Sequence, residues 1–140
     1  MARLNLHPIG EELAAVLSPA EITQQAGHTG TLEAALAEKV ATTHAGWGPE
    51  AAARVREKGK LTTWERLEAL VDPDTRMFEI GTLVNWGRSF RGSRRQAPGA
   101  GVVTVFARIH GRWTIVVAND NTVASGSWWP LSPEKIERAQ

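Results

Sequence analysis

The spacing of hydrophobic residues changes along this chain. In residues 18–71 apolar positions recur every three or four residues, as they do on one face of a helix. In residues 101–120 they form two dense runs rich in Val, Ile and Thr, a composition typical of strands. The chain is therefore expected to begin with helices and to continue with a β-hairpin, a loop and a last helix.

Residues that start and stop helices divide the first part of the chain. Three helices are expected before residue 60, and they are opened by the capping box Ser18-Pro19-Ala20-Glu21, by Thr31 and by Pro49. Gly46 and Gly59 are expected to end the second and third of them. Thr62 and Glu65 form a further capping box, which opens a fourth helix with an apolar stripe made of Trp64, Leu67, Leu70 and Val71.

A turn at Asp72-Pro73-Asp74 and a short candidate strand, RMFEIGTL (76–83), follow the fourth helix. The runs GVVTVFARI (101–109) and RWTIVVAND (112–120) are separated by His110-Gly111, which predicts a hairpin. The second run is nearly continuous in apolar residues, so both of its faces are expected to be covered. Ser132 is expected to cap the last helix.

Residues 85–100 have the composition of a loop and hold four arginines: Arg88, Arg91, Arg94 and Arg95. A guanidinium group matches the geometry of phosphate, although a solvated loop explains the same composition. Trp86 and Phe90 also suit the stacking of single-stranded nucleic acid. The formal net charge of +1 argues against that reading and against a membrane surface.

Composition narrows the classes further. The chain has 140 residues, about one domain, with 42% hydrophobic and 22% charged residues, which is ordinary for a folded protein. It contains no cysteine, which excludes disulfides, thiolate metal sites and a cysteine nucleophile. The four histidines lack the spacing of metal ligands, so no metal site is expected. No run reaches the roughly 20 apolar residues that span a bilayer, and a cytoplasmic location is expected.

Two stretches carry a resemblance: KGKLTTWERLEALVDP (58–73) and the segment from PGAGVVTVF to the end of the chain (98–140). Their order and spacing resemble the N-terminal portion of the carboxyltransferase (beta) subunits of biotin-dependent acyl-CoA carboxylases. Trp128-Trp129-Pro130 looks like the Tyr-Tyr-Pro of the methylcrotonyl- and geranyl-CoA carboxylase branch. The propionyl-CoA carboxylase type belongs to the same family, and residues 1–50 show no such resemblance.

This resemblance implies an α/β fold of the crotonase type, incomplete here and α+β within the segment. Residues 1–60 are expected to form an N-terminal helical arm, and residues 61–140 the first β-β-α unit of the carboxyltransferase domain. A single hairpin is marginally stable in water, and the last helix has about two turns, so the chain is expected to be part of a larger unit.

The family's reaction moves CO2 from carboxybiotin to the α-carbon of an acyl-CoA. The resemblance places the biotin on a partner subunit and the oxyanion-hole turns beyond the position matching Gln140, so no catalytic residue is assigned here. It implies acyl-CoA contacts in the small-residue loop, namely Val123, Ala124, Ser125, Gly126 and Ser127. Contacts with the CoA phosphates are expected from Arg91, Arg94 and Arg95. Ser125-Gly126 stands where the family usually has Gly-Gly.

Each of these residues also has a structural interpretation. The loop is explained equally well as a strand-to-helix connector, and Trp128 and Trp129 as core or subunit-interface packing. Asp120 is expected to cap the following turn rather than to act as a base, and Lys135 to lie on a solvated face.

Two other functions remain open. One is a subunit of a biotin-dependent decarboxylase of the glutaconyl-CoA type. The other is a non-catalytic assembly or regulatory piece that docks to a longer subunit. The partners expected under the first interpretation are a biotin carboxylase or biotin carrier subunit and the remainder of the carboxyltransferase subunit, in a homo- or hetero-oligomer.

Overall fold

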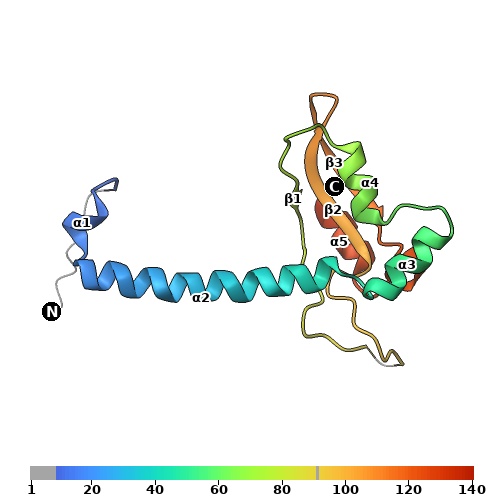
Figure 1. Cartoon of the computed structure of the whole chain (residues 1–140), viewed down its shortest axis with the longest axis horizontal. Coiled ribbons are helices and arrows are strands. Elements are labelled where there is room, and N and C mark those ends of the chain that lie inside the picture. The colour runs from blue at the N-terminus through green and yellow to red at the C-terminus, as the bar shows by residue number, and fades with distance from the viewer. Residues whose placement is uncertain (1–8, 91) are drawn as a thin grey trace. The chain divides into compact units, whose positions relative to one another are not determined.

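The computed structural model describes residues 9–90 and 92–140 (Figure 1). The chain divides into two compact units, one up to Glu38 and one from Lys39 to Gln140. The first unit holds α1 (Leu13–Val16) and most of α2 (Pro19–His44). The predicted capping box at Ser18 is confirmed: Ser18 N–H donates to Glu21 Oε2 at 2.9 Å, and Glu21 N–H donates to Ser18 Oγ at 3.3 Å.

The division of this region into two helices is wrong, because α2 runs without interruption through Gly27 and Gly30. Thr31 is an interior residue whose Oγ1 donates to the carbonyl of Gly27 at 3.0 Å, and it caps nothing. A glycine in a helix interior costs only about 1 kcal/mol relative to alanine, which the strong helix formers around it offset. Gly46 follows the end of the helix with φ of 56°, as predicted for a terminator.

Two shorter helices follow α2 in the second unit. Helix α3 (Pro49–Glu57) buries Ala51 and Val55. Helix α4 (Thr63–Leu70) begins at the predicted capping box, in which Thr62 N–H donates to Glu65 Oε2 at 2.7 Å. An ion pair of 2.7 Å between Arg56 and Glu65 joins the two helices.

The sheet has three antiparallel strands in the order β1 (Phe78–Glu79), β2 (Val102–Ile109) and β3 (Arg112–Asn119). The predicted hairpin is confirmed, since Ile109 pairs with Arg112 across a two-residue turn. The turn residues, His110 and Gly111, have φ of 49° and 75°, the positive values that a tight hairpin turn requires.

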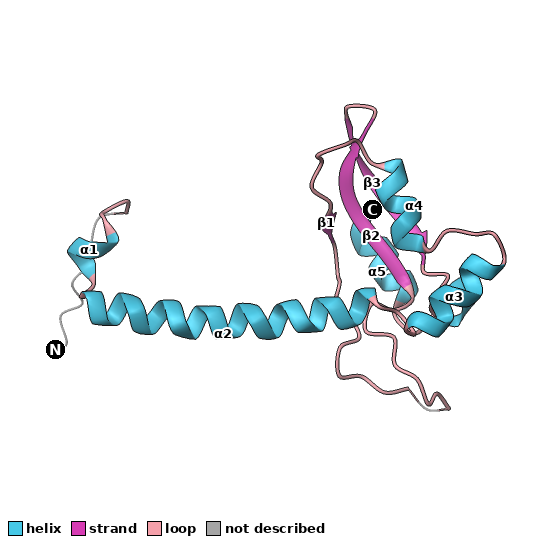
Figure 2. Ribbon diagram, viewed as in Figure 1, coloured by secondary structure: helices cyan, strands magenta, loops and turns pink. Residues whose placement is uncertain are grey.

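Helices lie on the sheet (Figure 2). Leu67 of α4 packs against alternate residues of the hairpin, namely Val103, Val105, Val116 and Ala118. Helix α5 (Ser132–Ala139) contacts β2 and β3, and Val102 and Thr104, which point away from the α4 side, are buried. Among the described residues no helix is long and apolar enough to cross a bilayer.

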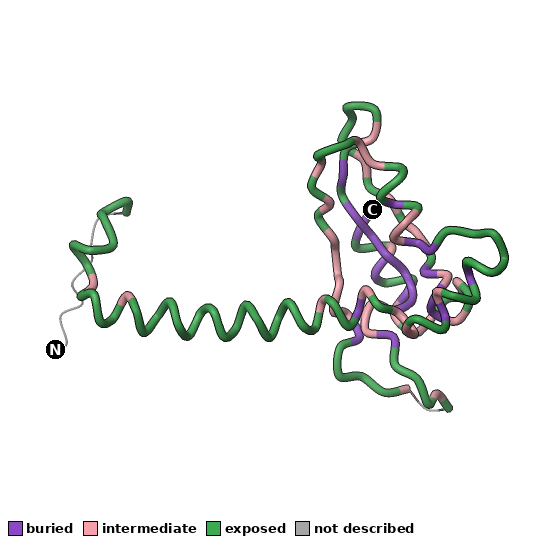
Figure 3. The backbone as a smooth tube through the Cα atoms, viewed as in Figure 1, coloured by how far each residue is buried: buried purple, intermediate pink, exposed green. Residues whose placement is uncertain are grey.

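The prediction that both faces of the second strand are covered is wrong (Figure 3). No residue of β3 is buried, and Trp113, Ile115 and Val117 are 54%, 37% and 40% exposed. The buried strand is β2, because it lies between two neighbours whereas β3 is at the edge of the sheet. The apolar residues Trp113, Ile115 and Val117 of β3 therefore mark a face of the sheet that the second unit leaves exposed.

The predicted cap at Ser132 is also wrong. Leu131, with φ of 70°, precedes the helix, and Ser132 is its first residue. The Ser132 side chain is buried and donates to the carbonyl of Ala100 at 2.5 Å. The Ser-Pro-x-Glu pattern does not distinguish a local cap from such a long-range hydrogen bond.

Candidate functional site

The small-residue loop begins where β3 ends. The carboxylate of Asp120 is buried and accepts two hydrogen bonds from Thr122, at 2.9 Å from its N–H and 2.7 Å from its hydroxyl. Both hydrogen bonds are accepted by one oxygen, Oδ1, within the turn, so the prediction that Asp120 is a turn cap is confirmed. This cap fixes the direction in which the chain enters the loop.

The centre of the loop has an unusual backbone. Ala124, Ser125 and Gly126 have φ of 47°, 55° and 85°, a region that residues other than glycine seldom occupy. The N–H of Gly126 donates to the carbonyl of Val123 at 2.9 Å. Within the described part of the chain, the N–H groups of Ala124 and Ser125 donate to no protein acceptor. Two adjacent backbone donors are thus available for an outside acceptor, and small side chains surround them.

A pocket of about 170 Å³ lies beside this loop. Its walls come from α3, from the segment after it, and from the loops around Arg95 and Ser125. Four of its side chains are cationic, and none of the residues lining it is acidic; the cations are Arg54, Lys58, Lys60 and Arg95. With no carboxylate among them, these charges give the pocket a positive potential that favours an anionic ligand.

Trp47 forms a further wall of this pocket. Its Nε1 donates to the carbonyl of Gln96 at 3.0 Å, and the guanidinium carbon of Arg95 lies 4.8 Å from the centroid of its ring. A cation stacked on an aromatic face at this distance is attracted by the ring. Trp47 therefore orients Arg95 toward the same space as Ser125, which makes this pocket the candidate functional site.

Only some of the residues that were predicted to contact CoA line the same pocket. Ser125 and Arg95 line the same pocket, although 30 positions separate them. Arg94 is exposed and does not line it, and Arg91 lies outside the described residues. Val123 is buried, and Gly126 and Ser127 are not among the lining residues.

Sequence reasoning missed the cations of α3 and the segment after it. The signal was present as the run RVREKGK (54–60), in which every second residue is basic. Arg54, Lys58 and Lys60 line the pocket, whereas Arg56 pairs with Glu65. Nothing in the local sequence shows that this run faces the loop after β3, because the two are about 65 positions apart.

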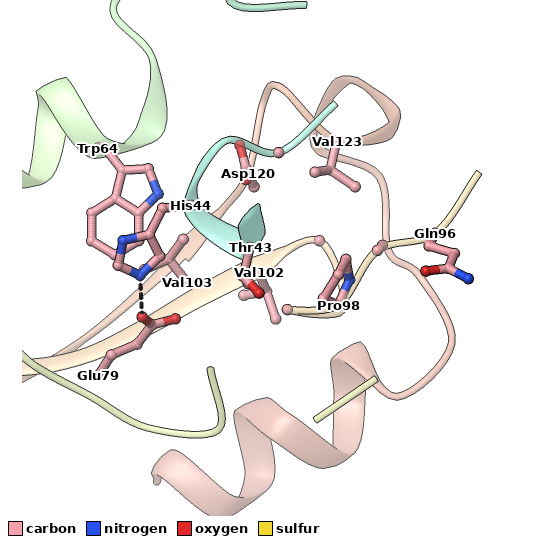
Figure 4. A pocket seen from close by; sticks show the side chains of 14 residues that line it. Thr43, His44, Trp64, Glu79, Gln96, Pro98, Val102, Val103, Asp120 and Val123 are labelled. Carbon is pink, nitrogen blue, oxygen red and sulfur yellow. Dashed lines mark hydrogen bonds and ion pairs between the residues drawn. The ribbon is translucent and has the colours of Figure 1, made fainter. Parts of the chain in front are cut away.

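A second, much smaller cavity of about 20 Å³ lies between α2, α4 and the sheet (Figure 4). His44 Nε2 lies 2.7 Å from Glu79 Oε2, and the His44 ring is 4.1 Å from that of Trp64. A cavity of this size holds about one water molecule. We therefore assign it to the packing of the second unit rather than to ligand binding.

Lys135 was predicted to lie on a solvated face, and this is wrong. The residue is 2% exposed. Its Nζ donates to the carbonyls of Gly99 and Val102 at 3.1 and 2.7 Å, and lies 3.7 Å from Glu79 Oε1. Burial lowers the pKa of this amine, and the nearby carboxylate of Glu79 offsets part of that effect. Lys135 thus holds α5 to the sheet and is unavailable to a phosphate.

The two adjacent tryptophans have different environments. Trp129 packs edge to face on Trp47, with ring centroids 5.7 Å apart, whereas Trp128 is 64% exposed. An interface role for Trp128 stays a prediction. In residues 9–90 and 92–140 no group of three or more His, Cys, Asp or Glu side chains is placed to hold a metal ion.

Residues 54–140 match the family model described as the carboxyl transferase domain. The chain is 37% identical over 109 residues to the biotin-dependent 3-methylcrotonyl-coenzyme A carboxylase beta1 subunit of Mycobacterium tuberculosis, covering 78% of this chain and 20% of that subunit. It is 36% identical over 90 residues to glutaconyl-CoA decarboxylase subunit alpha of Acidaminococcus fermentans, covering 64% of this chain and 14% of that subunit.

Among solved structures the chain is similar to transcarboxylase 12S, a hexamer whose crystal structure contains methylmalonyl-coenzyme A. The TM-score is 0.66 and the identity 30%, covering 74% of this chain and 20% of that one. The chain thus spans a fifth or less of the length of these relatives.

Proposed function

The chain belongs to the carboxyl transferase domain family, and from this premise we propose that it supplies part of the acyl-CoA site of a biotin-dependent acyl-CoA carboxyltransferase. The observation that carries the proposal is the basic pocket beside the loop of residues 122–127. CoA bears several phosphate oxygens, and a pocket with four cations and no carboxylate among its lining residues suits them.

The volume of the pocket suits part of a ligand rather than a whole one. Its volume of about 170 Å³ is below the roughly 300 Å³ at which pockets for whole ligands begin. The pocket therefore suits one end of a CoA molecule, with the phosphates against Arg54, Lys58 and Arg95. Ser125 lines the pocket, and its N–H group, with that of the neighbouring Ala124, would be a further donor.

The expected contacts at Val123, Gly126 and Ser127, and at Arg91 and Arg94, remain part of this proposal. Val123 is buried, so its contribution would be to the backbone conformation of the loop. Arg94 is exposed and free of the pocket walls, so it would reach CoA from outside. The side chains we expect to matter most are those that line the pocket, Arg54, Lys58, Lys60 and Arg95.

In the proposed reaction CO2 passes from carboxybiotin to the α-carbon of the acyl-CoA. We assign no catalytic residue to this chain: its role is to bind and position the substrate. The oxyanion-hole groups would lie in the part of a carboxyltransferase that these 140 residues do not match, and the biotin on a biotin carboxylase or carrier subunit of an oligomer. A cytoplasmic location and a classification with the ligases belong to the same proposal.

The division of the chain into two segments is also part of the proposal. Residues 1–60 would form an arm and residues 61–140 the start of the carboxyltransferase domain. The pocket is lined by residues 47–60 of the first proposed segment and by residues 95 and 121–125 of the second. The family match begins at residue 54 and the second compact unit at Lys39, both ahead of the proposed boundary.

Decarboxylation is the second candidate function. It is favoured by the 36% identity to a glutaconyl-CoA decarboxylase subunit. Both reactions need a CoA site, so the pocket fits either, and the direction depends on partners outside this chain. Exchange of labelled bicarbonate into an acyl-CoA by the assembled complex, with and without ATP, separates the two directions.

Calorimetric titration of the chain with acetyl-CoA and with dephospho-CoA tests the proposal. We expect Arg95→Ala and Lys58→Ala to weaken acetyl-CoA binding about threefold to tenfold each, since each removes a charged contact that solvent partly screens. Arg76→Ala and Arg138→Ala are matched controls, because neither residue lines the pocket. Absence of binding, or an equal loss in the controls, would contradict the proposal.

A further inference from the structure

Trp47 is an uncharged, aromatic wall of the basic pocket. It lies between Gly46 and Gly48, whose φ values are 56° and 87°, in the link from α2 to α3. Gly46 approaches the loop after β3 so closely that a side chain on it would collide with Thr122 Oγ1. This close approach holds the backbone next to Trp47 against the loop that also carries Ser125.

The indole ring of Trp47 contacts three other residues of the second unit. Its Nε1 donates to the carbonyl of Gln96 at 3.0 Å, and the guanidinium carbon of Arg95 lies 4.8 Å from the ring centroid. Trp129 packs edge to face on the same ring, with centroids 5.7 Å apart and an interplanar angle of 84°. The ring is therefore held by Gln96 and Trp129 independently of Arg95, and it provides a fixed platform for the guanidinium group.

The backbone that carries Arg95 is also fixed. Each carbonyl group from residue 95 to residue 99 accepts a hydrogen bond, and the donors include, in that order, Ser93, Trp47, Ala100, Asn85 and Lys135. Movement of this segment would break several of these bonds, and each broken bond costs free energy. Trp47 thus contributes both to the position of the Arg95 backbone and to the direction of its side chain.

Arg95 depends on such support because its side chain is exposed. An exposed arginine loses rotamer freedom when it binds a ligand, and this loss weakens binding. A ring that holds the guanidinium group beforehand reduces the loss. The attraction of an exposed cation to an aromatic ring corresponds to about twofold to fivefold in an equilibrium constant, which is large enough to measure in ligand binding.

The other cations of the pocket are not held in this way. In the part of the chain that the structure describes, the side chains of Arg54, Lys58 and Lys60 make no hydrogen bond, ion pair or ring contact. Their directions are free to adapt to a ligand, whereas the direction of Arg95 is set by Trp47 before a ligand binds.

We propose that Trp47 is a positioning residue of the acyl-CoA site, which acts through the stacking of its ring on Arg95 rather than through a contact of its own with CoA. This inference rests on the proposed function. Trp47 precedes residues 54–140, which match the family model, so it is contributed by the segment ahead of that match. The affinity of the pocket for CoA thus depends on a residue that itself bears no charge.

Calorimetric titration with acetyl-CoA tests this role in Trp47→Leu, Trp47→Phe, Arg95→Ala and the double variant of Trp47→Leu with Arg95→Ala. We expect Trp47→Leu to weaken binding about threefold, because the stacking is lost. The double variant should bind within about twofold of Arg95→Ala, since without Arg95 the ring has nothing to position. Trp47→Phe keeps an aromatic ring for Arg95 and should restore most of the affinity lost in Trp47→Leu. Trp113→Leu is the matched control, because the guanidinium carbon of Arg108 lies 5.9 Å from the Trp113 ring and neither residue lines the pocket.

Losses that multiply in the double variant would show that Trp47 contacts CoA itself, and they would overturn the inference. So would unchanged binding by Trp47→Leu, an equal loss in Trp113→Leu, or a Trp47→Phe variant as weak as Trp47→Leu. NMR of the wild type tests the stacking even if Trp47→Leu fails to fold: the Arg95 side-chain protons, assigned by their absence in Arg95→Ala, should be shifted upfield by the ring before acetyl-CoA is added. Ordinary arginine shifts would contradict the stacking. Failure of the wild type to bind acetyl-CoA would overturn the proposed function and this inference with it, whereas binding with multiplied losses would overturn this inference alone.

Discussion

Among the described residues, Lys135 is the charged residue that the fold removes most completely from water. Its amine is satisfied by the carbonyls of Gly99 and Val102, both of which lie where the loop enters β2. Gly99 leaves little room there, since a side chain on it would meet the Thr43 methyl group at 3.1 Å. A single buried amine thus ties α5 to the start of the hairpin.

This environment predicts a dependence of stability on pH. Burial lowers the pKa of Lys135 below its usual 10.5. Between the lowered pKa and 10.5 the unfolded chain binds more protons than the folded one, so the free energy of unfolding should rise with pH in that window. Urea unfolding at several pH values above 8 measures this slope, and Lys135→Met should flatten it.

At neutral pH the same substitution should lower the free energy of unfolding by about 1–3 kcal/mol, because two buried carbonyls lose their donor. Lys135→Met with unchanged stability and an unchanged pH slope would show that the amine is solvated. The ordinary reading of a lysine near the start of a helix, which the sequence favoured, would then be right.

At the scale of elements, Asp72 links the turn after α4 to the hairpin. Its two carboxylate oxygens accept from the N–H groups of His110 and Gly111, each at 2.7 Å. The hydrogen bond from Gly111 is the main reason that the pKa of Asp72 is lowered. The carboxylate therefore fixes the hairpin turn from outside.

The lowered pKa of Asp72 determines how the stability of the fold changes with pH. A depressed carboxyl pKa contributes stability above the unfolded value, and that contribution is lost as pH falls through the folded value. We expect Asp72→Asn to lower the melting temperature at pH 7, and the difference from the wild type to shrink below pH 4. A difference that is the same at pH 7 and pH 3 would rule out this role.

Helix α2 gives a prediction that separates one long helix from two short ones. In a continuous helix, Gly27→Ala should stabilise the first unit by up to about 1 kcal/mol and raise the helical signal in circular dichroism. Thr31→Ala should change stability little, because Thr31 caps nothing. A loss of about 1 kcal/mol in Thr31→Ala is what a helix start at that residue would give.

These elements show what local sequence predicts. The capping boxes at Ser18 and Thr62 and the turn at His110-Gly111 depend on neighbouring residues and are confirmed. The family and its fold, predicted from residues 58–73 and 98–140, are also confirmed. The exposure of β3 and the burial of Lys135 depend on which element covers which, and local patterns missed both.

Local sequence is equally limited as a guide to the candidate site. The sequence indicated Arg95 and Ser125 separately, but their meeting beside Trp47 is a property of the folded unit. The pocket cations from α3 and the following segment were missed, because a basic run at the end of a helix usually lies on a solvent-exposed face. Only the packing of α3 beside the loop after β3 turns that run into a pocket wall.

At the scale of the whole molecule, the basic pocket lies within the second unit. The basic pocket is proposed to hold one end of CoA. The residues that line the pocket lie in the ranges 47–60 and 121–125 and at position 95, and none of them belongs to the three strands. Substitutions of exposed strand residues should therefore leave CoA binding by the pocket unaffected.

The central claim is the position of the CoA site, and hydrogen–deuterium exchange of the intact chain with and without acetyl-CoA tests it most directly. We predict slower exchange in residues 54–60 and 121–127 when acetyl-CoA is present, with residues 105–117 of the hairpin unchanged. Unchanged exchange throughout, or slower exchange confined to the hairpin, would contradict the assignment of the basic pocket as the acyl-CoA site.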